Sequence, residues 1–169
     1  MIVRRARIED AEASAVVYAR VAEEGFLAAE PPVDLHERAQ RSRELIAADP
    51  PTAAWVLEDD GRIVGNAGAQ ERHPGVFSFG MAIVPEARGR GGGRALLAAI
   101  VEHARACGAH KVELEAWVDN ARAISVYAAA GFEVEGLRRD HYRRRDGSLR
   151  STLLMSRRLD VEPSDRLGG

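Results

Sequence analysis

Hydrophobic and polar positions along the chain show their clearest pattern in an apolar strand followed by an apolar helix. Residues 77–84 are mainly apolar and run into Pro85, which predicts a buried strand with a sharp exit. Beyond a loop rich in glycine and arginine, apolar residues recur at helical spacing until Gly108, which predicts a helix with one buried face. That face carries Leu96, Leu97, Ile100, Val101 and Ala104. We expect the loop between strand and helix to carry the chemistry.

The rest of the chain alternates between the same two periods. Further helices are expected at 11–24, at 34–48 and after Asn120, and strands at 2–8, 54–58, 62–70, 110–118, 132–137 and 151–159. Asp34 and Glu37 have the spacing of a capping box, and residues 8–10 can close the first strand and cap the first helix. Residues 59–61 and Asp146-Gly147 have the turn residues of hairpins.

Length and composition indicate one globular domain. The chain has 169 residues, 46% of them hydrophobic and 30% charged, and we expect a single domain over residues 1–159 with a disordered tail over 160–169. A formal net charge of −2 gives no general attraction to nucleic acid or to a membrane.

The single Cys107 excludes an intramolecular disulfide and offers no metal cluster, and it is expected to pack at a helix end. Without a long apolar N-terminal segment, a cytoplasmic protein is expected.

The loop over residues 88–94 has the composition of an anion-binding site. It reads Arg88-Gly89-Arg90-Gly91-Gly92-Gly93-Arg94. Glycines allow close approach of the main chain, and the start of the following helix offers unpaired N–H groups. A Walker loop is excluded because Gly93 is followed by Arg94-Ala95 where Lys and Ser or Thr are required. A dinucleotide fingerprint fits poorly, although the next strand carries Glu113 and Glu115, and a simple chain-turning loop stays an alternative.

Two motifs in order carry a family resemblance. Arg88, Gly91 and Gly93 fill the pattern Gln/Arg-x-x-Gly-x-Gly/Ala after a strand. Asn120, Ala123, Tyr127 and Gly131-Phe132 then fill Asn-x-x-Ala-x-x-x-Tyr-x-x-x-Gly-Phe, although an N-cap Asn and a half-buried Tyr would also explain two of these positions. Together the motifs resemble the GCN5-related N-acetyltransferase (GNAT) superfamily. The resemblance extends over residues 1–159 and is specific between 80 and 132.

The resemblance implies both a fold and a cofactor. The fold is α/β (α+β), with a mixed, mostly antiparallel twisted sheet of about six to seven strands, split by a V-shaped cofactor cleft and flanked by about four helices. Acetyl-CoA is the implied acyl donor, with its pyrophosphate on the glycine loop, and no metal is implied. Its pantetheine arm is expected to pair like an extra strand, near a bulge at Gly80 or Pro85. The implied cofactor-binding residues are Met81, Ile83, Val84, Arg88, Gly89, Arg90, Gly91, Gly92, Gly93, Arg94, Asn120 and Ala123.

The resemblance also implies an activity and its catalytic residues. We expect direct transfer of an acetyl group to a primary amine, on a small molecule or a protein N-terminus, in a ternary complex. Tyr127 is expected to protonate the leaving thiolate, because a phenol stays protonated at neutral pH. Glu115, five residues before Asn120, is expected to remove a proton from the amine, with Glu113 on the same strand face and water as alternatives.

The acceptor is the least determined part of the sequence. In the resembling family, the segment between the first two helices and the last hairpin lie beside the acceptor, so Phe26, Glu30 and Tyr142 are candidate contacts. The arginine-rich segment 138–150 favours an acceptor with acidic character and argues only weakly for nucleic acid, since the whole chain is acidic. A non-catalytic acyl-CoA sensor and a homodimer, a state often seen in the family, stay open.

Overall fold

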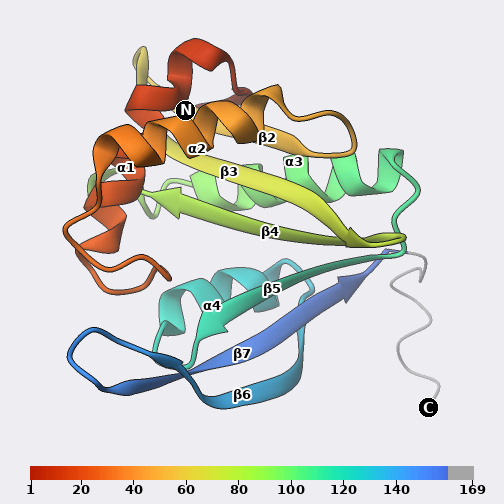
Figure 1. Ribbon diagram of the computed structural model, residues 1–169. Helices are drawn as coiled ribbons and strands as arrows, with labels where there is room; N and C mark the ends of the chain where they lie inside the picture. Colours follow the sequence, from red (N-terminus) through yellow and green to blue (C-terminus); the bar gives the residue numbers. More distant parts are fainter. Residues whose placement is uncertain (160–169) are drawn as a thin grey trace.

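A single seven-stranded sheet organises the chain in the computed structural model, which describes residues 1–159 (Figure 1). The strands are β1 (Ile2–Arg5), β2 (Ala53–Asp59), β3 (Arg62–His73), β4 (Val76–Ile83), β5 (Lys111–Trp117), β6 (Glu133–Arg143) and β7 (Leu149–Arg158). The helices are α1 (Ala11–Ala22), α2 (Leu35–Ala47), α3 (Gly92–Ala106) and α4 (Ala121–Ala129), with 3₁₀ turns at Ile8–Asp10 and Pro85–Ala87. The strand order is β1-β2-β3-β4-β5-β7-β6, and only the β4–β5 pair is parallel. The mixed, mostly antiparallel sheet expected from the sequence is confirmed.

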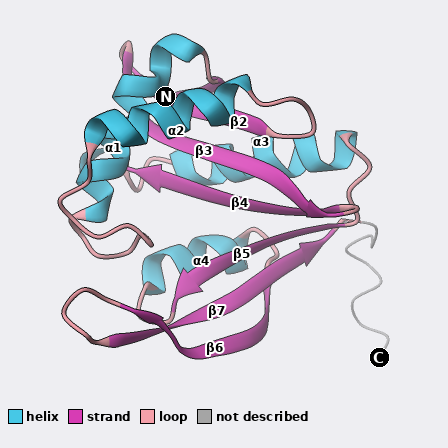
Figure 2. Cartoon of the chain, in the orientation of Figure 1, coloured by secondary structure: helices cyan, strands magenta, loops and turns pink. Residues whose placement is uncertain are grey.

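Helices cover both faces of the sheet (Figure 2). The apolar face of α3 packs against β2, β4 and β5, where Leu57, Phe77 and Leu96 are fully buried. On the opposite face, Val17 and Val21 of α1 pack with Ala82 of β4 and with Val84 just beyond it. The alternation of a strand therefore places the odd side chains of β4 toward α3 and α4, and its even side chains toward α1.

The β4 and β5 strands separate after a short contact. They pair only over residues 76–78 and 111–113, whereas β4 continues to Ile83 and β5 to Trp117. The split begins after Ser78, so the bulge predicted at Gly80 or Pro85 is wrong. The register irregularity of the β3–β4 pair lies instead between Glu71 and His73. Both partners diverge without a bulge, which leaves the main chain of each facing the gap.

Several local predictions are confirmed, and others need correction. Asp34 accepts a hydrogen bond from the Glu37 N–H, and residues 60 and 61 have positive φ in the β2–β3 turn. β6 extends to Arg143, well beyond the predicted strand 132–137, and β7 begins at Leu149, two residues before the predicted strand 151–159. Cys107 is exposed rather than packed. The tail predicted over 160–169 lies outside the described residues, and no helix among residues 1–159 is long and apolar enough to span a membrane.

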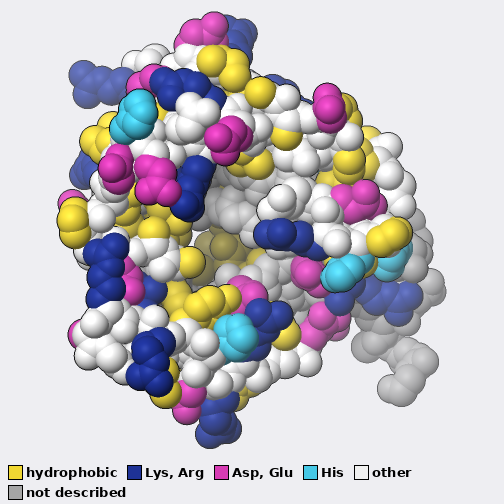
Figure 3. Space-filling view, in the orientation of Figure 1, with side chains coloured by type: hydrophobic (Ala, Val, Ile, Leu, Met, Phe, Trp, Pro, Cys, Tyr) yellow, Lys and Arg dark blue, Asp and Glu magenta, His cyan; other side chains and the backbone are white. Residues whose placement is uncertain are grey.

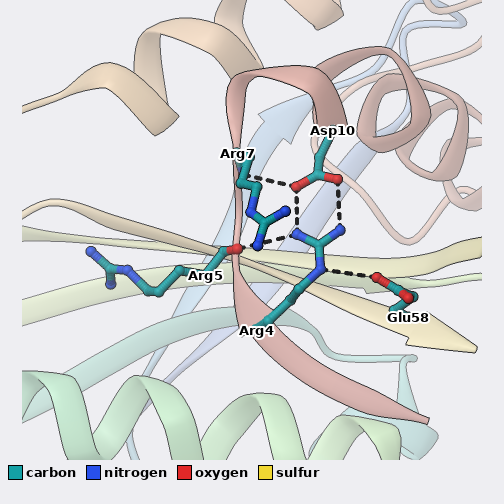
Figure 4. A network of polar contacts seen from close by, with 5 residues as sticks. All are labelled: Arg4, Arg5, Arg7, Asp10 and Glu58. Atoms are coloured by element: carbon teal, nitrogen blue, oxygen red, sulfur yellow. Dashed lines mark hydrogen bonds and ion pairs between the residues drawn. The ribbon is translucent and has the colours of Figure 1, made fainter. Parts of the chain in front are cut away.

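Asp10 fastens the N-terminal segment instead of capping α1 (Figure 4). Its carboxylate accepts hydrogen bonds from the Arg7 N–H at 2.7 Å and from both terminal nitrogens of Arg4 at 2.7 and 2.9 Å. Arg4 also donates to Glu58 of β2. The Arg4 guanidinium lowers the pKa of Asp10. This buried network ties β1, the first 3₁₀ turn and β2 together.

Candidate active site

A large cavity occupies the split between β4 and β5. Its volume is about 1130 Å³, and it reaches from the glycine loop, past α4, to the segment between α1 and α2 and to the β6–β7 hairpin. Figure 3 shows the surface hollowed in this region, between the two halves of the sheet. The cavity exists because two strands that begin as a parallel pair diverge, so a ligand can lie between them.

The glycine loop forms one end of the cavity. Gly91 is the N-cap of α3 with φ of +86°, and a Cβ built on it would have no neighbour within 4 Å. The first hydrogen bond of α3 runs from the Ala95 N–H to the Gly91 carbonyl. The N–H groups of Gly92 and Gly93 lie before this bond and have no partner within the helix. Gly92 is required for packing, since a Cβ there would approach Leu57 Cδ2 to 2.4 Å. The end of the cavity thus combines open space with unpaired N–H groups and the positive end of a helix dipole.

The loop arginines have different surroundings. Arg88 lines the cavity, but its Nε donates to the Ile83 carbonyl at 2.8 Å and its terminal nitrogens bind both oxygens of Glu24. This contact lowers the pKa of Glu24. Arg90 pairs with Asp59 at 2.6 Å and does not line the cavity. Arg94 lines the cavity and has no carboxylate partner within residues 1–159, so it is the loop arginine that is free to meet an anion.

Main-chain groups of β4 face the split at alternate residues. The Val84 N–H donates to Val64 of β3, so this residue directs its polar groups away from the gap. Alternation then directs those of Met81 and Ile83 toward β5, and both residues line the cavity. Of the three predicted strand contacts, Met81 and the N–H of Ile83 can therefore pair with an extended ligand, whereas the Ile83 carbonyl already accepts from Arg88. The prediction for Val84 does not fit this geometry.

Three residues of the second motif meet the cavity from α4. The Asn120 side chain caps α4 by accepting from the Ala123 N–H at 3.2 Å, and its Nδ2 has no partner within residues 1–159. Tyr127 is 8% exposed, with its ring edge-on to Phe79, and its hydroxyl has no hydrogen-bond partner among the same residues. Burial raises the pKa of Tyr127 to about 12. All three predicted motif residues line the cavity.

Glu115 lines the cavity from β5 and is held by three donors. Its carboxylate accepts from Arg138 at 2.7 Å, from the Tyr142 hydroxyl at 2.8 Å and from the Thr152 hydroxyl at 2.9 Å. The alternation of β5 places Glu115 on the face of the sheet opposite Tyr127, because Leu114 and its even-numbered neighbours pack with the α3 and α4 core. The split connects these two faces.

The remaining predicted residues surround the far end of the cavity. Phe26 and Tyr142 line it. Burial and the hydrogen bond to Glu115 raise the pKa of Tyr142. Glu30 does not line the cavity, and its carboxylate binds the β6–β7 turn instead. Glu113 also lies outside the lining, beside Lys111 in the paired part of β5.

Several polar or aromatic lining residues were not predicted from the sequence. Among them are Glu24, Trp117, Asp119, Arg122 and Thr152. Alternation had already placed Trp117 on the face of Glu115, and Arg122 lies inside the Asn-x-x-Ala motif, so both had a signal that could have been used. Thr152 faces the site only because β7 pairs with β5 in a register that sets it opposite Trp117. No three His, Cys, Asp or Glu side chains gather as metal ligands within residues 1–159.

Comparison with solved structures identifies similar folds. The ribosomal-protein-alanine N-acetyltransferase of Brucella melitensis is 26% identical with a TM-score of 0.83, over 94% of this chain and 100% of that one. A phosphinothricin acetyltransferase of Sinorhizobium meliloti, solved in complex with acetyl-CoA, is 25% identical with a TM-score of 0.81, over 94% and 88% of the two chains. The putative acetyltransferase yncA of Salmonella typhimurium, with its cofactor acetyl-CoA, shares the fold at 23% identity and a TM-score of 0.81, over 96% and 95%.

Sequence comparison points to the same group of proteins. No curated protein matches the chain significantly. The family described as "Acetyltransferase (GNAT) family" matches residues 19–132, which include the glycine loop, the split strands and the Asn120–Phe132 motif. This match spans more than half of the chain and includes the end of the cavity that the glycine loop forms, called the donor end below. The chain therefore belongs to the acetyltransferase (GNAT) family.

Proposed function

We propose that the protein is an acetyl-CoA-dependent N-acetyltransferase that transfers an acetyl group directly to a primary amine in a ternary complex. The observation that carries the proposal is the open split between β4 and β5, with the glycine loop at one end and with Glu115 and Tyr127 on opposite faces. A thioester that lies in this split can be attacked from one face while its sulfur leaves toward the other.

Acetyl-CoA fits the donor end of the cavity. Its pyrophosphate would accept hydrogen bonds from the N–H groups of Gly92 and Gly93 and would pair with Arg94. Its pantetheine amides would pair with the main chain of Met81 and Ile83 as an added strand. Arg88, whose guanidinium is already bound, would brace the loop rather than contact phosphate.

Glu115 is the proposed base for the acceptor. An ammonium has no lone pair, so it must lose a proton before its nitrogen can attack the thioester carbon. In the step itself the C–N bond forms and the C–S bond breaks, and the bonding pair goes to sulfur. Of the two protons that an ammonium acceptor loses, one ends on sulfur and one reaches solvent. Glu115 would accept, through water, the proton that the ammonium loses before attack, and would pass it to solvent. The proton that the nitrogen loses as the C–N bond forms ends on sulfur. Tyr142 and Thr152 fix the Glu115 carboxylate.

The pKa of Tyr127 decides how it can assist the leaving group. Burial raises the pKa of Tyr127 to about 12. A thiol such as that of Cys ionises near 8.5, so full proton transfer from the phenol would be uphill by about 5 kcal/mol. We therefore propose that Tyr127 donates a hydrogen bond to the sulfur as its negative charge develops. A charge-assisted hydrogen bond of this kind contributes about 1.5 to 3 kcal/mol.

Amine-dependent release of free thiol from acetyl-CoA tests the proposal. We expect a panel of primary amines to include acceptors for the wild type, with kcat reduced roughly 10- to 100-fold in Tyr127→Phe and roughly 100-fold or more in Glu115→Gln. Glu113→Gln is the matched control, because Glu113 shares the strand face but lies outside the cavity. Equal loss in Glu113→Gln, or none in Glu115→Gln, would reject Glu115 as base.

The same assay addresses the non-catalytic alternative. Tight acetyl-CoA binding by the wild type, with no thiol release for any amine in the panel, would reject the enzyme and favour an acyl-CoA sensor. Tyr18→Phe controls for the general effect of removing a phenol, since Tyr18 lies in α1, under Arg38 and outside the cavity lining.

A further inference from the structure

The segment between α1 and α2 is fastened to the β6–β7 hairpin across one end of the cavity. The two segments are far apart in sequence, yet they lie side by side in Figure 1, where the orange loop meets the blue hairpin. Between them lies the side of the cavity that bears Glu115. How firmly they are joined therefore decides what can enter beside Glu115.

Glu30 is the centre of this contact. Both of its carboxylate oxygens accept from the main-chain N–H of Arg145, at 3.0 and 3.1 Å, and the Nε of Arg144 lies 3.6 Å from Oε1. The Arg145 side chain donates to the Pro31 carbonyl at 3.0 Å. Only 23% of the Glu30 side chain and 10% of the Arg144 side chain are exposed, so solvent screens this ion pair less than a fully exposed one.

Two hairpin arginines extend the contact to β5. Arg144 and Arg150 lie over the Trp117 ring, with their guanidinium carbons 5.5 and 4.4 Å from its centre. Arg144 also donates to the Ala28 carbonyl at 3.0 Å, and Arg150 donates to the Gly25 carbonyl. Each guanidinium therefore joins a β5 aromatic ring to a loop carbonyl. The loop is held to the sheet as well as to the hairpin.

The wall formed by the fastened loop and the opposite side of the cavity is largely apolar. Phe26, Leu27 and Ala28 of the fastened loop line the cavity, as do Trp117 and Tyr142 on the other side.

Three arginines of the hairpin are already paired with carboxylates. Arg138 pairs with Glu115, Arg144 with Glu30, and Arg150 with Asp119. An acidic group on the acceptor would have to displace a carboxylate to reach any of these three. Arg122, which lines the cavity, has no hydrogen-bonded carboxylate within residues 1–159, so the acidic acceptor stays a prediction.

We propose that Glu30 latches the α1–α2 loop onto the β6–β7 hairpin, and that the latch limits the acceptor to small primary amines with a largely apolar body. This inference rests on the proposed acetyltransferase function. A polypeptide N-terminus must carry its following residues through the gap that the latch closes, whereas a small amine fits beside Glu115 within the wall. Glu30 is thus a positioning residue that sets specificity without contacting the acceptor.

The test compares one small amine and one peptide as acceptors. We expect wild-type kcat/KM for 2-phenylethylamine to exceed that for a hexapeptide with a free N-terminal alanine by about tenfold or more, which corresponds to at least about 1.4 kcal/mol. In Glu30→Ala this ratio should fall about tenfold through KM of the acceptors, with KM for acetyl-CoA unchanged. Glu30→Gln, which keeps an oxygen for the Arg145 N–H, should restore part of the ratio.

Glu37→Ala is the matched control, because Glu37 lies exposed on α2, pairs with Arg41 and does not line the cavity. Amide hydrogen exchange over residues 25–34 should rise in Glu30→Ala and not in Glu37→Ala. If the wild type prefers the peptide, or if the ratio of kcat/KM values is unchanged in Glu30→Ala, the latch inference is overturned but the proposed acetyltransferase function is not. A wild type inactive on every amine would remove the proposed function, and unchanged exchange in Glu30→Ala would independently remove the latch.

Discussion

Replacing Gly91 by alanine should weaken acetyl-CoA binding more than it weakens the fold. Gly91 has φ of +86°, where an L-residue with a Cβ is strained by about 1 to 2 kcal/mol. The added methyl group meets no protein atom within 4 Å, so strain is the only cost in the free protein. In the complex, the same methyl group would occupy space that the bound pyrophosphate is proposed to fill.

The expected magnitudes separate the two effects. For a chain of this length, strain of about 1 kcal/mol should lower Tm by about 2 to 4 °C. Acetyl-CoA at about 100 times its Kd should raise the wild-type Tm by about 5 to 11 °C, from about 2.7 kcal/mol of linkage. If Gly91→Ala binds about tenfold more weakly, the same ligand concentration contributes about 1.4 kcal/mol and a rise of about 3 to 6 °C.

Gly108→Ala is the matched control for thermal unfolding with and without acetyl-CoA. Gly108 follows the opposite end of α3, has φ of +77° and likewise has no neighbour for a Cβ. It should show the same loss of Tm in the free protein and the full wild-type rise with ligand. If Gly91→Ala also keeps the full rise, the main chain at the start of α3 does not hold the pyrophosphate, and the reasoning that places it there is refuted.

Three further predictions concern the interactions that support the site. Asp10→Asn should lower the free energy of unfolding at pH 7 by about 2 kcal/mol in urea titrations, because it breaks a charged hydrogen-bond pair with Arg4. The pKa of Asp10 is lowered in the folded state, so its contribution is complete above the unfolded value near 3.9 and is lost as pH falls through the folded value. The difference between wild type and variant should therefore shrink as pH falls below about 3.9, and a constant difference would contradict this. Gly92→Ala should cost about 1 to 3 kcal/mol, because its Cβ would meet the buried Leu57, and an unchanged Tm would show that β2 and α3 can move apart freely. Arg88→Lys should weaken acetyl-CoA binding in calorimetry because a lysine cannot make the same three contacts, and wild-type affinity would show that the brace is dispensable.

Local sequence determined most elements of this fold. The apolar stripe of α3 and the alternation of β5 depend on the fixed periods of helix and strand, which do not need tertiary information. The capping role of Asp34 was predictable for the same reason, since a helix cap is a local requirement. β6 and β7 were underestimated because charged residues in 138–150 suppress an apolar pattern, whereas an exposed hairpin tolerates them on both faces.

The partners of charged side chains were decided only by the tertiary structure. The sequence placed Arg88 and Arg90 with the phosphate site, but Glu24 and Asp59 bind their guanidinium groups. Glu30 had been a candidate acceptor contact, yet it binds a turn more than 100 residues away. Charged residues follow no periodic pattern along the sequence, and the partner of each depends on which segments of the chain the fold brings together.

The glycine-loop end of the cavity could be predicted from the chain's local patterns, because the glycine loop and the Asn120–Tyr127 helix face each have a fixed spacing. The tertiary structure alone decided the split between β4 and β5, since pairing across a sheet joins residues that are distant along the chain. It also decided which main-chain groups face that split and which charges on the acceptor side are already paired. These features depend on register and long-range packing, which no window of sequence contains.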